Sequence, residues 1–376
     1  MPLFDVYPRF DVTPVRAKGA YVYDEKGQEY LDFYGGHGVI SIGHTHPHYV
    51  KLLEQQLQLI GFYSNSVNMP LQEELAKKLA IQSGYADHQL FLCNSGAEAN
   101  ENALKLASFH TGKKKVIAFR KSFHGRTAAT LNVTDNANIS APINLDNYPV
   151  VWADLNNEKA VTQALRTKDV AAVIVEGIQG VGGLDMPTVA FLQFLSKSCK
   201  ENDALLILDE IQSGYGRSGK FFAHQYAGIQ PDLITMAKGM GNGFPIGGVL
   251  IAPQIKAKAG MLGTTFGGNH LACTAGIAVL DVLATEKLIS NVIQMHQLLI
   301  DGLQHILGVR VIKGKGLMLG VQFDFPVKEM RSKLLYEHHV FTGAASDPTL
   351  LRILPPLGID AAHIQTFIHA LKNVLT

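Results

Sequence analysis

Two ionisable residues stand out because each follows a short apolar run. Asp209 closes the run Leu205–Leu208, which has the length and composition of a buried strand. Its carboxylate should therefore emerge at the carboxyl end of that strand, where open α/β sheets bind their ligands. Lys238 follows an apolar run at residues 233–237 and precedes a glycine-rich stretch at 239–248, a composition that predicts an irregular loop. A lysine held on a turn and removed from water loses its proton readily and becomes a nucleophile.

A second candidate site is the segment Asn94–Asn100, which reads NSGAEAN. It lies between a predicted strand at 89–93 and a predicted helix that ends at Gly112. The first amides of a helix have no internal partners, and the helix dipole attracts anions, so Ser95, Gly96 and Ala97 form a candidate phosphate site. Ser95 also suits the simpler role of an N-cap.

A third segment, Ser122–Thr127 (SFHGRT), follows a predicted strand at 116–119. Phe123 can stack on a flat ring, and the guanidinium of Arg126 can bind a carboxylate through two hydrogen bonds. An ordinary surface loop is the alternative. Glu176 ends another predicted strand, at 171–175, and precedes a glycine-rich turn.

The elements that carry these residues predict an α/β protein. A strand at 171–175, a helix at 188–199 and the strand at 205–208 have the spacing of parallel strands joined by a right-handed crossover. Several such strands ending in polar residues imply one shared cleft. Further elements are predicted as a strand at 247–252 and helices at 47–60, 71–82 and 271–285.

Both ends of the chain predict smaller antiparallel sheets. Residues 19–24 and 29–33 alternate as paired strands do. A long helix at 288–307 leads into an antiparallel pair at 309–312 and 317–323, and a helix follows at 328–338. Val340–Phe341 and residues 350–356 are expected to close that carboxyl-terminal sheet, with Arg352 pointing into the cleft or making a surface ion pair.

Composition excludes several classes of protein. The 376 residues are 47% hydrophobic with a net charge of +1, so we expect a globular protein with no nucleic-acid or anionic-membrane partner. No segment approaches the roughly 18 apolar residues that span a bilayer. Three separated cysteines in apolar surroundings indicate buried thiols and a cytoplasmic protein. His44, His46 and His48 alternate like metal ligands, but local hydrogen bonding explains them better, because zinc sites need three or four ligands.

Taken together, these segments closely resemble the class III (ornithine-type) pyridoxal-phosphate aminotransferases over essentially the whole chain. Each motif alone is modest, but all of them occur in the family's order. The motifs are SGAEAN at 95–100, SFHGRT at 122–127, EGIQG at 176–180, LDEIQSGYGRSGK at 208–220, AKGMGNGFPIGG at 237–248, GTTFGGN at 263–269 and LRILPPL at 351–357.

The resemblance implies a fold-type I architecture: a large domain with a mainly parallel seven-stranded sheet flanked by helices, and a small α+β domain. The expected divisions are an amino-terminal arm and small sheet at 1–43, a large cofactor-binding domain at 44–285, and a small domain at 286–376. It also implies a homodimer with shared active sites. The implied reaction moves an amino group from an N-acylornithine to 2-oxoglutarate, with acetyl as the default acyl group.

Site roles also follow from the resemblance. Lys238 would hold pyridoxal 5'-phosphate covalently and carry the proton, and Asp209 would pair with the pyridine nitrogen. The other implied cofactor contacts are Ser95, Gly96 and Ala97 at the phosphate, Phe123 on the ring face, Gln212 at the ring hydroxyl, and Thr265 at the phosphate of the other subunit. The implied substrate contacts are Arg126 and Arg352 for carboxylates, with Glu176 and the amino-terminal Tyr7.

Two positions depart from the family pattern. Val181 stands where the family has a glutamate that masks the arginine matching Arg352, and His37 replaces a commonly apolar residue. Succinylornithine therefore stays open as a donor, as do the ornithine, 4-aminobutyrate and aminomutase activities of the same class. A nucleotide-binding regulatory protein is the rival from another class, but neither GxGxxG nor GxxxxGK[ST] occurs in the required context.

Overall fold

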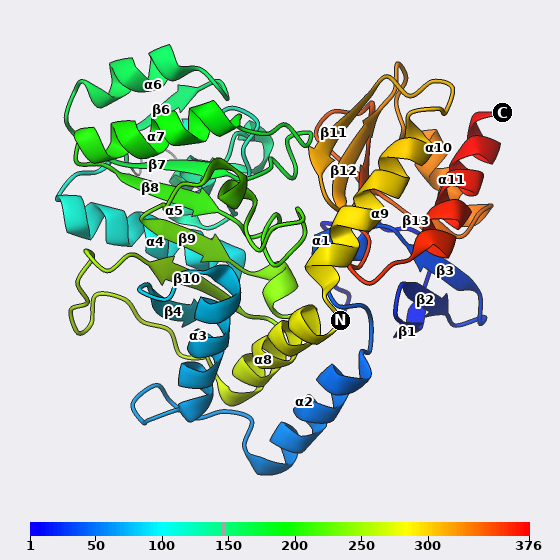
Figure 1. Cartoon of the computed structure of the whole chain (residues 1–376), viewed down its shortest axis with the longest axis horizontal. Coiled ribbons are helices and arrows are strands. Elements are labelled where there is room, and N and C mark those ends of the chain that lie inside the picture. The colour runs from blue at the N-terminus through cyan, green and yellow to red at the C-terminus, as the bar shows by residue number, and fades with distance from the viewer. Residues whose placement is uncertain (145–147) are drawn as a thin grey trace.

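The computed structural model describes residues 1–144 and 148–376. Its centre is a seven-stranded sheet in the order β4-β10-β9-β8-β7-β5-β6, drawn in the left half of Figure 1. Only β10 runs antiparallel to its neighbours; the other pairs are parallel. The predicted mainly parallel α/β sheet is thus confirmed. Its strands are β4 (Gln89–Cys93), β5 (Lys115–Phe119), β6 (Val150–Ala153), β7 (Val170–Glu176), β8 (Leu205–Asp209), β9 (Leu233–Met236) and β10 (Gly247–Ile251).

Helices cover both faces of this sheet because side chains alternate along each strand. In β7, Ala172 and Ile174 pack in the same cluster as α4 (Gly96–Thr111). Val173 and Val175 face the opposite way, toward α6 (Glu158–Leu165) and α7 (Val189–Glu201). All of β7 is buried, as expected for a central strand of a sheet covered on both sides.

In Figure 1, α2, α3 and α8 lie below the sheet, and α9, α10 and α11 lie to its right beside the smaller sheets. The largest apolar cluster includes nine buried residues of α8 and side chains of α3 and α9. α9 begins three residues after α8 ends and leads into the carboxyl-terminal part of the chain. The helices are α2 (Pro47–Leu59), α3 (Pro70–Ser83), α5 (Ala128–Asn132), α8 (His270–Thr285), α9 (Leu288–Leu303), α10 (Lys328–Tyr336) and α11 (Ala361–Leu375).

Two four-stranded sheets lie to the other side, and one of them corrects the sequence prediction. Val340–Phe341 (β13) does not close the carboxyl-terminal sheet; it pairs in parallel with β3, in an amino-terminal sheet of order β1-β2-β3-β13. A single residue, Thr342, separates β13 from β14, which takes the expected place beside β15. The strands are β1 (Pro14–Lys18), β2 (Tyr21–Asp24), β3 (Glu29–Asp32), β11 (Val311–Lys315), β12 (Met318–Gln322), β13, β14 (Gly343–Ala344) and β15 (Leu350–Ile353).

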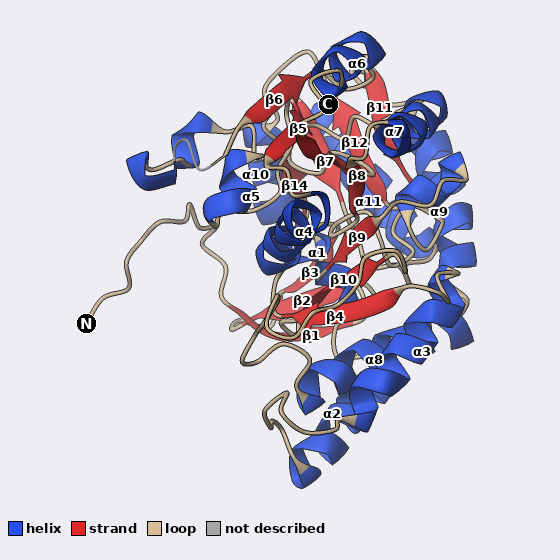
Figure 2. Ribbon diagram, turned by 90° about the vertical axis from the view of Figure 1, so that its left-hand side faces the viewer, coloured by secondary structure: helices blue, strands red, loops and turns tan. Residues whose placement is uncertain are grey.

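The amino terminus is an extended arm. Residues 1–10 are exposed, and Figure 2 shows the arm leading away from the body of the chain. Among the described residues, no helix is long and apolar enough to cross a membrane.

Candidate active site

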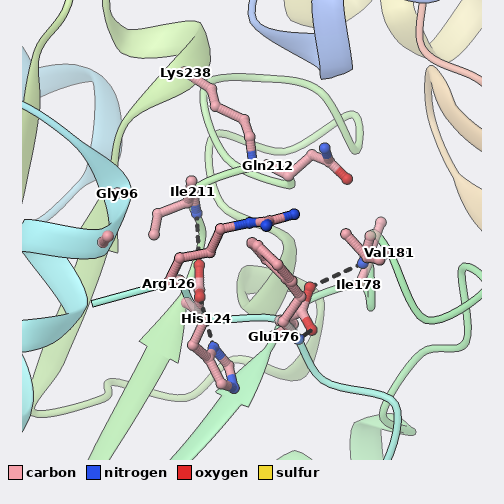
Figure 3. Close-up of a pocket in the computed structure, with 14 residues that line it drawn as sticks. Gly96, His124, Arg126, Glu176, Ile178, Val181, Ile211, Gln212 and Lys238 are labelled. Atoms are coloured by element: carbon pink, nitrogen blue, oxygen red, sulfur yellow. Dashed lines mark hydrogen bonds and ion pairs between the residues drawn. The ribbon is translucent and has the colours of Figure 1, made fainter. Parts of the chain in front are cut away.

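The site begins where β7 and β8 end side by side. Glu176 and Asp209 are register partners across these parallel strands. Both continue the alternation that points toward α4, so their carboxylates emerge on the same face of the sheet. A cavity of about 320 Å³ opens there (Figure 3). Its walls include Gly96, Ala97, Phe123, Arg126, Glu176, Asp209, Gln212 and Lys238, which brings together most of the residues that the sequence singled out.

Asp209 is almost completely buried and is held by three donors. Asn100 Nδ2 and His124 Nδ1 each lie 2.7 Å from its Oδ2 atom. The Ile211 N–H donates to its Oδ1 atom at 3.1 Å. A buried carboxylate needs such hydrogen bonds to remain ionised.

Lys238 lies directly after β9, at the start of a short 3-10 turn (Lys238–Met240). Its backbone φ is +46°, in the left-handed region that non-glycine residues seldom occupy. Burial lowers the pKa of its amine; Asp209 and Glu176 oppose this effect, while Arg352 adds to it. The amine is thus shifted toward the neutral form that a nucleophile requires.

Helix α4 begins against the cavity. The Ser95 hydroxyl caps it by accepting the Glu98 N–H, and it also donates to the Glu98 carboxylate. Gly96 and Ala97 then present the first helical amides to the cavity wall. A Cβ on Gly96 would stand 2.8 Å from Ile211 Cδ1, so the helix approaches the end of β8 as closely as only glycine permits.

Gln212 connects the cavity to a left-handed turn. Its Nε2 donates to the backbone oxygen of His37 at 2.8 Å, and within the described chain its buried Oε1 has no partner. All residues of Gly35–Gly38 have positive φ. The His37 ring pairs with the Tyr34 hydroxyl, and burial, with Arg352 and Lys238 adding to it, lowers the His37 pKa to about 4.

Glu176 bridges two segments of the wall. Its carboxylate accepts the Phe123 N–H at 3.0 Å and the Gly180 N–H at 2.9 Å. Burial raises its pKa to about 7, and Asp209 adds to the rise, while His124 and the two backbone donors oppose it. The Gly180 carbonyl in turn accepts from Arg352 Nη1 at 2.7 Å, so one buried carboxyl group links Phe123 to the position of Arg352.

Four predicted residues lie outside this cavity wall. Arg352 is buried behind Gly180, and burial lowers its pKa. Ser95 is occupied as the cap of α4. Thr265 is exposed on another part of the surface, and Tyr7 is 74% exposed on the extended arm. Arg126 does line the cavity and is exposed.

The sequence analysis quoted Asn100 and His124 within motifs but gave them no role, and it gave none to Ile211 beside Asp209. The i, i+4 spacing from Gly96 to Asn100 is the signal that places Asn100 on the inner face of the helix. Elsewhere, His44, His46 and His48 each contact a different carboxylate, those of Asp32, Glu286 and Asp281.

Comparison with known proteins defines the class. Residues 6–375 match the family model "Aminotransferase class-III", and the chain belongs to that family. It is 39% identical to the acetylornithine aminotransferase of Bacillus subtilis, over 99% of this chain and 97% of that protein. It is 37% identical to the acetylornithine aminotransferase of Methanocaldococcus jannaschii, over 99% and 95%. Among solved structures, the ornithine aminotransferase of Toxoplasma gondii superposes with a TM-score of 0.91 at 28% identity, covering 99% of this chain and 92% of that one.

The chain is therefore an aminotransferase that acts with pyridoxal phosphate, and the cavity fits this cofactor. Asp209 Oδ1 accepts one hydrogen bond and keeps acceptor capacity for a ring N–H. Gln212 lines the same cavity, and its buried Oε1 has no hydrogen-bond partner among the described residues. The start of α4 provides amides and a positive dipole end for a phosphate. Phe123 and Ile211 provide apolar wall, and Lys238 provides the amine.

Proposed function

We propose that this chain transfers the terminal amino group of N2-acetylornithine to 2-oxoglutarate, giving N-acetylglutamate 5-semialdehyde and glutamate. The observation that carries the proposal is the near-full-length similarity to acetylornithine aminotransferases of several organisms, at 36–39% identity for the first four. The domain divisions at 1–43, 44–285 and 286–376 are part of this proposal.

Lys238 performs the proton transfers in the proposed mechanism. Its lowered pKa supplies a neutral amine at the cavity wall, which first holds the cofactor and, once displaced by substrate, moves a proton at the reacting carbon. When bound, pyridoxal phosphate would supply an electron-accepting ring and an aldehyde carbon that carries the amino group between the two halves of the reaction. Asp209 would stabilise the protonated ring nitrogen, and Phe123 would pack on the ring face.

Two arginines bind the substrate carboxylates in this proposal. Arg126 is exposed at the cavity and is assigned to the carboxylate of the acylated donor. Arg352 is assigned to the α-carboxylate of glutamate; its guanidinium donates to the carbonyl of Gly180, which lines the cavity. Guanidinium groups suit both tasks because they bind a carboxylate with two parallel hydrogen bonds.

The assembly in the proposal is a homodimer, in which Thr265 of one subunit contacts the phosphate held by the other. An exposed apolar surface beside Thr265 supports it: Phe62 packs on Phe266 at a centroid distance of 5.3 Å, and the two side chains are 42% and 60% exposed. The proposed compartment is the cytoplasm, because Cys93, Cys199 and Cys273 are buried free thiols.

The identity of the amino donor is tested with a panel of four candidate donors. We expect acetylornithine to give the highest kcat/KM with 2-oxoglutarate, ahead of succinylornithine, ornithine and 4-aminobutyrate. Lys238→Ala protein is the blank for each donor. A higher kcat/KM for succinylornithine or an unacylated donor would replace the proposed substrate while keeping the reaction class. If none of these donors transferred its amino group, the proposal would be overturned.

A further inference from the structure

The Asp209 carboxylate sits in a fully buried set of polar side chains that has only one consistent arrangement. Thr235 and Asn100 are completely buried, and His124 is 2% exposed. The Thr235 hydroxyl donates to Asn100 Oδ1 at 2.7 Å. The Asn100 amide then directs both hydrogens of Nδ2 to acceptors, one to Asp209 Oδ2 at 2.7 Å and one to the His124 carbonyl at 2.8 Å.

The reverse orientation of the Asn100 amide is excluded by electrostatics. It would place Oδ1 against the Asp209 carboxylate and leave two acceptors facing each other in a buried site, which costs the full desolvation of both groups. Asn100 is therefore a fixed donor to Asp209.

His124 is fixed in the same way. A carboxylate only accepts, so the imidazole must carry a hydrogen on Nδ1 to bind Asp209 Oδ2 at 2.7 Å. Its Nε2 atom is buried and, within residues 1–144 and 148–376, has no hydrogen-bond partner. The geometry therefore makes Nδ1 the donor to Asp209 and gives Nε2 no part in this arrangement.

The two donors converge on one oxygen. With Oδ2 occupied by Asn100 and His124, the remaining acceptor capacity of the carboxylate lies on Oδ1, which accepts, from the described part of the chain, only the Ile211 N–H at 3.1 Å. Asp209 itself lines the cavity. In Figure 3, the His124 ring lies at the bottom of the view, at the opposite end from Lys238 and Gln212.

We propose that Asn100 and His124 form a clamp that keeps the Asp209 carboxylate ionised and turns its Oδ1 toward the cavity, which makes both of them positioning residues for the ring nitrogen of the cofactor. The clamp acts through Asp209 and touches neither substrate. It rests on the class of the enzyme and is independent of the acyl donor, because it is measured without any amino donor present.

The test compares paired variants of the full chain. Asn100→Leu removes both hydrogens that the Asn100 amide donates. The control is Asn102→Leu on the same helix, because the Asn102 side-chain amide donates to the Glu98 carbonyl. His124→Leu removes the ring, whereas His124→Asn places an N–H near the position of Nδ1 and nothing at Nε2. The dissociation constant of pyridoxal phosphate and the pH dependence of its visible absorbance are measured for each, with the melting temperature of the cofactor-free protein as a folding check.

Asn100→Leu and His124→Leu are expected to weaken cofactor binding by roughly ten- to a hundredfold, the range for a hydrogen bond to a charged group. The ring should also lose its proton at lower pH in both. Asn102→Leu should match the wild type, and His124→Asn should recover most of the loss. Unchanged affinity and absorbance in both leucine variants, with only the melting temperature lowered, would make the cluster merely structural. A His124→Asn protein as impaired as His124→Leu would show that His124 acts through Nε2 and overturn its part in the clamp.

Discussion

At the scale of single residues, substrate selection depends on what faces Arg352. The guanidinium bonds a neutral carbonyl, that of Gly180, and no ion pair to a carboxylate within the described ranges involves it. Val181, where the family pattern has a glutamate, lines the cavity next to Gly180. Among the described residues, no carboxylate therefore forms an ion pair with the buried guanidinium of Arg352.

Val181→Glu should therefore close Arg352. The new carboxylate would compete with the α-carboxylate of glutamate, and we expect KM for glutamate to rise by about tenfold, corresponding to about 1.4 kcal/mol. KM for the acylated donor should change little, so the ratio of the two constants is the measurement. Val181→Gln, which has the same shape without the charge, is the matched control. An unchanged ratio in Val181→Glu would mean that Val181 does not govern Arg352.

Single-residue reasoning from sequence found the groups that carry charge or follow a strand, such as Lys238 and Asp209. It gave no role to Asn100 or His124, although both stand inside quoted motifs. The contacts of Asn100 with Asp209 span 109 positions in the chain, and the Nδ1 assignment of His124 depends on which acceptor the fold brings to it. Such partners are defined by packing, which one sequence does not display.

At the scale of elements, the start of α4 against the end of β8 sets the depth of the cavity. Gly96 allows that approach, because a Cβ there would lie 2.8 and 2.9 Å from two atoms of Ile211. Gly96→Ala must push the helix or Ile211 away, so we expect cofactor affinity to fall by about tenfold, with a small loss of stability. Equilibrium binding of pyridoxal phosphate measures it.

The double variant Gly96→Ala with Ile211→Val is the control for this prediction. Valine lacks the Cδ1 atom that the new methyl group would meet first, so the double variant should recover part of the affinity. Failure to recover, or an unaffected Gly96→Ala protein, would contradict the assignment of Gly96 to a steric limit at the helix start.

The secondary-structure elements also differ in how well hydrophobic patterns in the sequence predict them. Apolar runs predicted β4, β5, β7, β8 and β10 within a residue or two of their bounds, because buried strands are continuous in hydrophobicity. The two-residue strand β13 has no periodicity, and its assignment to the wrong sheet followed from its position in the chain. The last helix, α11, and the β6–α6 pair were not predicted at all.

At the scale of the whole molecule, two of the four predicted residues that lie outside the cavity wall are exposed on the surface of the chain. Thr265 and Tyr7 are both exposed, on a loop before α8 and on the extended arm. The proposed dimer accounts for Thr265 by placing it in the site of the other subunit. If the site is shared between subunits, two chains with different damaged residues can together form one intact site, which a site contained in one chain does not allow.

Mixing two inactive variants tests this sharing. Lys238→Ala removes the reacting amine, and Thr265→Asp sets a negative charge against the phosphate. In a mixed dimer, the site with an intact Lys238 receives an intact Thr265 from the Lys238→Ala chain. The two chains are mixed, unfolded and refolded together. Half of the dimers should then contain one intact site, so about a quarter of the wild-type activity should return. Each variant refolded alone should stay near zero. As a check on refolding, Lys238→Ala is mixed with the surface variant Lys256→Ala. This mixture should recover the activity of the sites whose own chain keeps Lys238. Absence of recovery in the first mixture, with recovery in the second, would mean that Thr265 serves the site of its own chain or none.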